Sequence, residues 1–230
     1  MSSIHFIGGE KGGVGKSMTS RLLAQYYIDR ETPFLGFDSD ASHGTFSRFY
    51  GEFASSVIVA EDDSLDGIIE ACESQPDHDL IVDLAAQTST RLGEWIEEAD
   101  VFGLFSELGY TVYLWHVMDD GADSVDLLAR VLSRYPQPEL RFVVVQNLGR
   151  GSNFSELHDS KPYQEAMARG AYLFELGKLN PKLAHKVDFA NASFWAAANN
   201  RDLMNMAERQ RVRVWLRNNY GQLDKLLANE

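Results

Sequence analysis

Short apolar runs alternate with amphipathic stretches along most of the chain. The runs that have the length and composition of buried strands are Ile4–Ile7, Pro33–Phe37, Ser56–Ala60, Leu80–Val82, Thr111–Val117, Arg141–Val145 and Ala171–Glu175. Helical spacing of apolar residues fills 16–30, 63–73, 88–108, 121–134 and 160–169. This alternation predicts right-handed β-α-β units, and therefore an α/β fold with a mostly parallel twisted sheet covered by helices on both faces.

The last third of the chain has a different pattern. Residues 180–200 are rich in loop residues with short helices, and 201–227 has the pattern of one long amphipathic helix. No repeat, low-complexity tract or linker separates this part from the rest. We therefore expect a single domain over residues 1–230, with 180–230 as a helical C-terminal portion.

Composition narrows the class of protein. The 230 residues are 44% hydrophobic, which is enough for one domain with a substantial core, and the formal net charge of -13 disfavours broad nonspecific binding to nucleic acid. The single cysteine, Cys72, excludes a disulfide framework within the chain. Neither a signal peptide nor an apolar run of membrane-spanning length is visible, so we expect a cytoplasmic protein.

The first apolar run leads into a glycine-rich segment that can bind phosphate. Residues Glu10–Ser17 read E-K-G-G-V-G-K-S. Glycine lets backbone N–H groups approach phosphate closely, Lys16 adds a point charge, and the Ser17 hydroxyl can bind Mg²⁺. The positive end of the following helix adds to this attraction. Glu10 stands where the strict pattern G-x-x-x-x-G-K-[ST] has glycine.

The variant pattern K-G-G-x-G-K-[ST], with Lys11 as a second lysine, resembles the loop of the ParA/MinD family of deviant Walker A (P-loop) ATPases. The resemblance implies that ATP and Mg²⁺ are the cofactors. It implies nucleotide contacts from Lys11, Gly12, Gly13, Val14, Gly15, Lys16, Ser17 and Met18. It further implies that Lys11 reaches across an ATP-bound dimer to the partner's phosphates, so Lys11 acts in catalysis beside Lys16.

Acidic residues end two of the predicted strands. Asp38 and Asp40 form a D-x-D motif after one run, and Asp83 ends another. Carboxylates at this edge of a sheet can hold Mg²⁺ or orient a water molecule, whereas the alternative for each is a turn or helix-capping acid. By resemblance, Asp40 helps to position the hydrolytic water, and Asp83 and Asp38 join Ser17 at the metal.

The segment after Asp83 departs from the family pattern. It reads L-A-A-Q-T, without the proline and glycine of D-x-P-P-G or D-x-P-A-G. A further strand ends at Asn147, which by resemblance reads the adenine edge, because an amide both donates and accepts hydrogen bonds. A turn asparagine before Gly149 fits equally well. The GTPase pattern N/T-K-x-D is absent, which favours ATP.

The C-terminal helix carries basic residues on one face, Arg209, Arg213 and Arg217. Some members of the resembled family bind DNA near this end, but a solvated face fits the acidic chain better, so DNA binding is not favoured. The faintly amphipathic residues 224–230 predict no membrane docking. We expect His116 in the core, together with the aromatic residues Phe194, Trp195 and Trp215.

Two classes of function follow. In the first, the chain is a weakly hydrolysing ATPase, stimulated by a partner, that forms a homodimer on ATP binding. It positions or partitions a plasmid, a chromosome or a protein complex through a protein activator or cargo adaptor. In the alternative, it is an ATP-dependent ligase or synthase that acts on a small carboxylate. The opening G-G-E-K-G-G-V-G-K-S and the small size also resemble plasmid stabilisation or mobilisation ATPases of the StbB/TraL kind.

Overall fold

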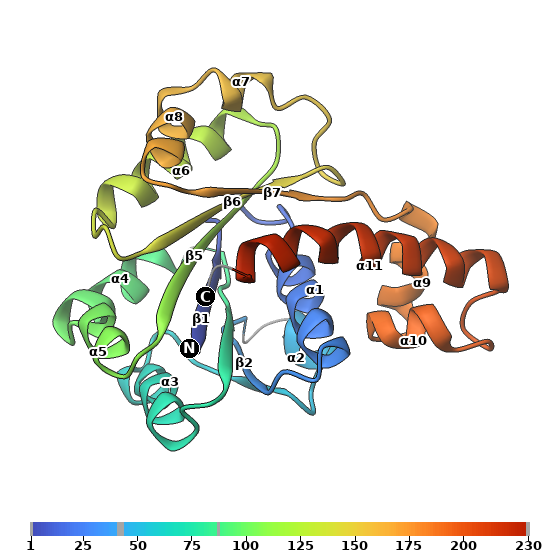
Figure 1. Cartoon of the computed structure of the whole chain (residues 1–230), viewed down its shortest axis with the longest axis horizontal. Helices are drawn as coiled ribbons and strands as arrows, with labels where there is room; N and C mark the ends of the chain where they lie inside the picture. Colours follow the sequence, from blue (N-terminus) through green and yellow to red (C-terminus); the bar gives the residue numbers. More distant parts are fainter. Residues whose placement is uncertain (1, 41–43, 87, 229–230) are drawn as a thin grey trace.

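A parallel sheet forms the centre of the molecule. The computed structural model describes residues 2–40, 44–86 and 88–228, and within them seven strands lie in the order β3-β2-β4-β1-β5-β6-β7, every neighbouring pair parallel. The strands are β1 (Ser3–Gly8), β2 (Phe34–Asp38), β3 (Ala54–Ser56), β4 (Asp79–Asp83), β5 (Thr111–Met118), β6 (Arg141–Asn147) and β7 (Tyr172–Leu176). The predicted α/β fold is confirmed (Figure 1).

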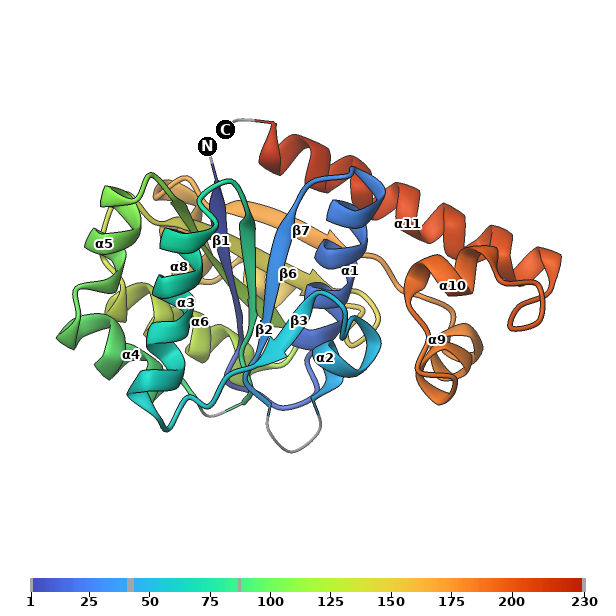
Figure 2. The same cartoon turned by 90° about the horizontal axis from the view of Figure 1, so that it is seen from below.

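Helices cover both faces of the sheet (Figure 2). On one face lie α1 (Lys16–Asp29), α2 (Thr45–Phe49), α9 (Pro181–Phe189), α10 (Phe194–Asn199) and α11 (Met206–Leu227). On the other lie α3 (Asp62–Ser74), α4 (Ser89–Glu98), α5 (Val101–Glu107), α6 (Ala122–Arg134), α7 (Ser155–His158) and α8 (Lys161–Ala168). Strands buried on both faces read as near-continuous apolar runs, which explains the sequence pattern.

Two predicted elements differ from the structure. The strand expected at Ser56–Ala60 is wrong, because β2 ends at Asp38 opposite Ser56 and offers later residues no partner; β3 instead covers Ala54–Ser56. The helix expected at 88–108 is two helices, since Asp100 adopts a left-handed conformation with φ 45° between α4 and α5. A continuous α-helix cannot pass through that conformation.

The long C-terminal helix protects an edge of the sheet. It begins at Met206, five residues after the predicted start, because Asn205 and Glu208 form a reciprocal capping box. Further along, Gln222 accepts from the Glu175 backbone N–H at 2.8 Å and donates to the Glu175 carbonyl at 2.9 Å. This helix therefore satisfies backbone groups that edge strand β7 would otherwise expose.

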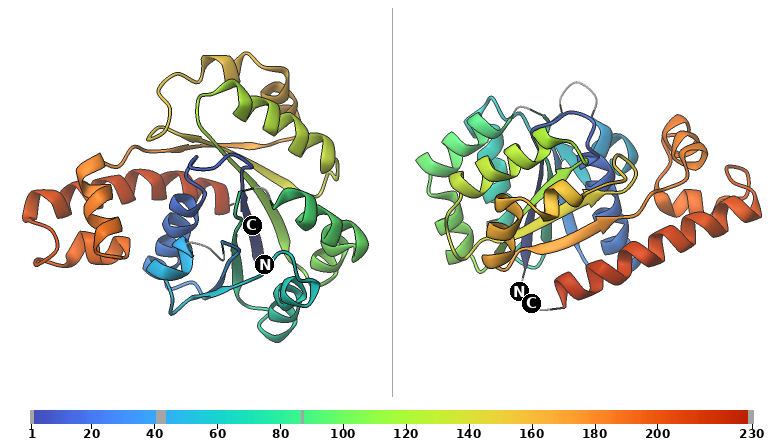
Figure 3. Two further views of the ribbon diagram at one scale, coloured as in Figure 1. Left: turned by 180° about the vertical axis from the view of Figure 1, so that it is seen from behind. Right: turned by 90° about the horizontal axis from the view of Figure 1, so that it is seen from above.

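The C-terminal portion projects beside the sheet, as α9, α10 and the first turns of α11 show in Figure 3. Phe194 and Trp215 are buried as expected, but Trp195 is 57% exposed, so its prediction as core is wrong. Neighbouring residues on a helix point in different directions, and Phe194 takes the inward position. His116 is buried, and it bonds the Ser124 carbonyl. No helix of the described residues has both the length and the apolar character that a membrane crossing requires.

Candidate functional site

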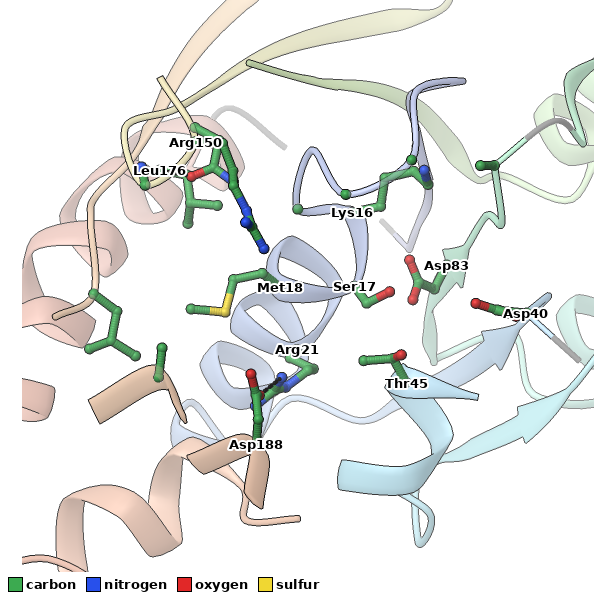
Figure 4. A pocket seen from close by; sticks show the side chains of 18 of the residues that line it. Lys16, Ser17, Met18, Arg21, Asp40, Thr45, Asp83, Arg150, Leu176 and Asp188 are labelled. Carbon is green, nitrogen blue, oxygen red and sulfur yellow. Dashed lines mark hydrogen bonds and ion pairs between the residues drawn. The ribbon is translucent and has the colours of Figure 1, made fainter. Parts of the chain in front are cut away.

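A cavity of about 830 Å³ opens at the carboxyl edge of the sheet. Its walls come from the glycine-rich loop, the start of α1, α2, α9 and the segments that follow β2, β4, β6 and β7. Figure 4 shows Lys16, Ser17, Asp83 and Asp40 on one side of this cavity and Leu176 and Arg150 on the other. The strand ends have therefore brought together residues that are distant in the sequence, as the α/β architecture predicts.

The glycine-rich loop has a backbone that requires glycine. Gly15 has φ 111°, and a Cβ there would lie 2.2 Å from the Asn147 Nδ2 atom. Lys16 follows as the first residue of α1, and its buried ammonium donates to the Lys11 carbonyl at 3.1 Å. Burial lowers the pKa of Lys16, while the nearby carboxylates of Asp83 and Asp40 act in the opposite direction.

Asp83 lies buried at the end of β4, next to the start of α1. Its Oδ1 atom accepts from the Ser20 hydroxyl at 2.9 Å, and Ser17 also donates to this carboxylate. Burial raises the pKa of Asp83 to about 7, with the Asp38 charge adding to the effect and the serines and Lys16 opposing it. A hydroxyl beside a carboxylate is a donor set that suits Mg²⁺. Ser20 was not anticipated, although it lies one turn after Ser17.

The two acids at the end of β2, Asp38 and Asp40, have different surroundings. Asp40 lines the cavity, whereas Asp38 does not. The Asp38 carboxylate accepts from the Asp40 N–H at 3.0 Å and from the Ser47 N–H at 2.8 Å. It therefore holds the turn into α2, which agrees with the capping alternative, and the metal contact of Asp38 stays a prediction.

Lys11 does not line the cavity. Its Nζ lies 2.8 Å from Asp119 Oδ2 in the loop after β5, and Asp119 also accepts from the Ser124 hydroxyl at 2.6 Å. The hydrogen bond to Asp119 raises the pKa of Lys11. Sequence reasoning missed Asp119, although its position two residues after the strand candidate Thr111–Val117 resembles that of the other strand-end acids.

Asn147 connects the end of β6 to the glycine-rich loop. Its Nδ2 donates to the Val14 carbonyl at 2.6 Å, and its Oδ1 accepts from the Gly149 N–H at 2.9 Å. The second contact is the one expected of a turn asparagine. Both sides of the amide are thus used within the chain, and the adenine contact stays a prediction.

Other cavity residues were not anticipated from the sequence. The segment after β7 and α9 contribute an apolar wall that contains Leu176, Leu179, Pro181 and Ala184. Arg21 is buried, lies over the Phe49 ring at 3.5 Å from its centre, and pairs with Asp188 at 3.0 Å. The segment after β7 follows a strand candidate, and this position is the only sequence signal that could have suggested that it contributes to the site. Gln87, in the second switch segment, and the tail residues Asn229 and Glu230 lie outside the described residues.

Comparisons with known proteins agree with this arrangement. No protein-family model matches the chain. It is 24% identical to Protein MobD of Acidithiobacillus ferrooxidans over 92% of this chain and 93% of that protein. It is 26% identical to a Protein TraL of Escherichia coli over 97% of this chain and 98% of that protein.

Solved structures show the same fold. MinD of Aquifex aeolicus has a TM-score of 0.56 at 12% identity, covering 96% of this chain and 98% of that one. A ParA family ATPase of Chlorobium tepidum has a TM-score of 0.57 at 11% identity, covering 94% and 98%. MinD of Pyrococcus horikoshii, solved with Mg-ADP, has a TM-score of 0.57 at 12% identity, covering 98% and 97%. These findings confirm the ParA/MinD-type fold and the relation to TraL.

Proposed function

We propose that this P-loop protein of the ParA/MinD type, a relative of TraL and MobD, is an ATP-binding and weakly hydrolysing molecular switch. It dimerises on ATP binding and positions or partitions a cargo with the help of a protein activator or adaptor. The observation that carries the proposal is that buried Lys16 and Asp83 meet half-buried Ser17 at one end of a large cavity. The Mg-ADP in the Pyrococcus horikoshii MinD structure supports the choice of ligand.

The distribution of polar and apolar groups in the cavity favours one orientation of the bound nucleotide. The phosphates lie along the glycine-rich loop, where backbone N–H groups and Lys16 supply positive charge. Ser17 and Asp83, with Asp38 as a further candidate, hold Mg²⁺, which neutralises charge on the phosphates. The base lies toward the apolar wall formed after β7. Polar groups at one end and apolar groups at the other are the arrangement that a nucleotide requires.

Asp40 has the role of orienting the attacking water. It lines the cavity beside Asp83, and as a carboxylate it adds little attraction for a triphosphate. We expect Asp40→Ala to bind ATP and to hydrolyse it on the order of 10²–10⁴ times more slowly with the partner present, as for loss of a positioned group. Hydrolysis by this variant at the wild-type rate would assign Asp40 to the turn alone.

Lys11 has its role in the dimer. Its ion pair with Asp119 opens so that the side chain reaches the partner's phosphates. The pair is partly exposed, and its net contribution is on the order of 1 kcal/mol, which is less than the attraction of Lys11 to a triphosphate. Lys11→Ala should bind nucleotide and remain monomeric in light scattering with a slowly hydrolysed ATP analogue. A fully dimeric variant would refute the role in trans.

Titration calorimetry with Mg-ATP tests the nucleotide site. Lys16→Ala should lose most of the ATP affinity, because it removes the buried charge of the loop. Lys161→Ala is the matched control, since Lys161 is an exposed lysine at the start of α8. Equal affinities for the wild type and Lys16→Ala would contradict the assignment. DNA binding stays outside the proposal, since Arg209 donates to the Met204 carbonyl and Arg213 to Asn199.

A further inference from the structure

Arg150 is a cation that points into the cavity from the side of the apolar wall. Figure 4 shows its side chain beside Leu176, with the guanidinium directed toward Met18 in the middle of the cavity. Within residues 2–40, 44–86 and 88–228, no carboxylate forms an ion pair with it. By contrast, the guanidinium of Arg21, which also lines the cavity, is paired with Asp188.

The backbone that carries Arg150 is held from both sides. The N–H groups of Arg150 and Gly151 donate to the Asn147 carbonyl at 2.9 and 3.0 Å. The next two N–H groups, of Ser152 and Asn153, donate to Asp120 Oδ2 at 2.8 and 3.2 Å. The backbone thus places Arg150 firmly at the cavity, and its guanidinium has no carboxylate partner among the described residues, so it is available to an anionic ligand.

The position of the loop also fits a role toward the nucleotide. Asn147 anchors the Arg150 turn and, through its amide, the carbonyl of Val14 in the glycine-rich loop. The two loops therefore keep a fixed relation, and Arg150 and Lys16 reach the same cavity from different strands. Two cations that converge on one cavity suit a ligand with several negative charges better than a neutral one.

We propose that Arg150 is a nucleotide-binding residue that donates to the phosphate chain from the side of the apolar wall, opposite the glycine-rich loop. A guanidinium presents paired N–H donors that match phosphate oxygens, which an ammonium cannot reproduce. Arg150 thereby adds to the preference for nucleoside diphosphates and triphosphates over the nucleoside that Lys16 and the glycine-rich loop already give. The inference rests on the proposed nucleotide site and adds a residue that lies outside the glycine-rich loop and both acidic switch segments.

The experiment compares ligands that contain the phosphates, the nucleoside or both. Calorimetry measures Mg-ATP and Mg-ADP, and displacement of a fluorescent ADP measures adenosine and pyrophosphate. Arg150→Ala should weaken ATP, ADP and pyrophosphate about ten- to hundredfold, as for the loss of charge-assisted hydrogen bonds, and leave adenosine unchanged. Arg150→Lys should recover part of the loss. Arg141→Ala is the matched control, because Arg141 is exposed at the opposite end of β6.

The outcomes separate this inference from the proposed function. Unchanged ATP affinity in Arg150→Ala, while Lys16→Ala has lost it, would overturn the role of Arg150 and leave the nucleotide site intact. An equal loss of adenosine and ATP would also overturn it, because it would place the guanidinium on the base. Failure of the wild type to bind any of the nucleotides would instead contradict the proposed function. Both arginine variants should melt at the wild-type temperature, because the side chain is exposed.

Discussion

Replacing Asn147 with alanine distinguishes its two roles. In the structure, its amide joins the end of β6 to the glycine-rich loop through the Val14 carbonyl at 2.6 Å and the Gly149 N–H at 2.9 Å. Asn147 is 5% exposed and Val14 is buried, so water does not readily replace the bond between them. If this contact holds the loop in place, the protein without nucleotide should lose stability. If Asn147 only contacts the adenine of a bound nucleotide, the stability of the nucleotide-free protein should not change.

The size of the loss follows from the two contacts. Leaving the buried Val14 carbonyl unpaired costs about 1–3 kcal/mol, and losing the bond to the exposed Gly149 adds about 0.5–1.5 kcal/mol, which together give about 2–4 kcal/mol. For a chain of 230 residues, that corresponds to a fall in melting temperature of roughly 4–16 °C. Asn147→Asp should lose at least as much, because it keeps the acceptor for Gly149 but sets a buried carboxylate oxygen against the Val14 carbonyl.

Urea unfolding of the nucleotide-free protein measures the loss. Asn218→Ala is the matched control, since Asn218 is an exposed asparagine of α11 and its loss should change the free energy of unfolding by less than about 0.5 kcal/mol. An unchanged midpoint for Asn147→Ala, together with weaker ATP binding, would refute the anchoring role and favour the adenine contact.

Three further changes test the packing around the site. Gln222→Ala should destabilise the fold by about 1–3 kcal/mol in urea unfolding and speed hydrogen exchange at Glu175, because both backbone groups of that edge residue lose their partner; an unchanged exchange rate would contradict this. Tyr50→Phe should cost a similar amount, about 1–3 kcal/mol, since the buried hydroxyl accepts from the Phe194 N–H, and wild-type stability would argue against it. Burial lowers the pKa of His5 to about 3, so as the pH falls His5 takes up a proton in the unfolded chain before it does so in the folded protein. The free energy of unfolding should therefore decrease below about pH 6.5, by about 2 kcal/mol at pH 5. If a His5→Gln variant lost stability with falling pH as the wild type does, protonation of His5 would not be the cause.

The sequence determined the type of each element near the site. β1, the glycine-rich loop and α1 could be predicted because each depends on local properties: an apolar run, glycines that permit a left-handed backbone, and helical spacing. Lys16, Ser17 and Asp83 could be expected near each other, since parallel strands end at one edge. The break at Asp100 could not be predicted, because it interrupts an otherwise continuous helical pattern.

The tertiary structure decided which partner each functional side chain meets. The Lys11–Asp119 pair joins residues 108 positions apart, and the Asn147 amide reaches Val14 across 133 positions. Such contacts depend on the strand order, which places β5 beside β1 and β6 beside β5. A sequence pattern reports short-range periodicity and backbone preference. It does not fix the order of strands in a sheet, because many orders bury the same apolar runs equally well and only the packing of the whole chain selects one.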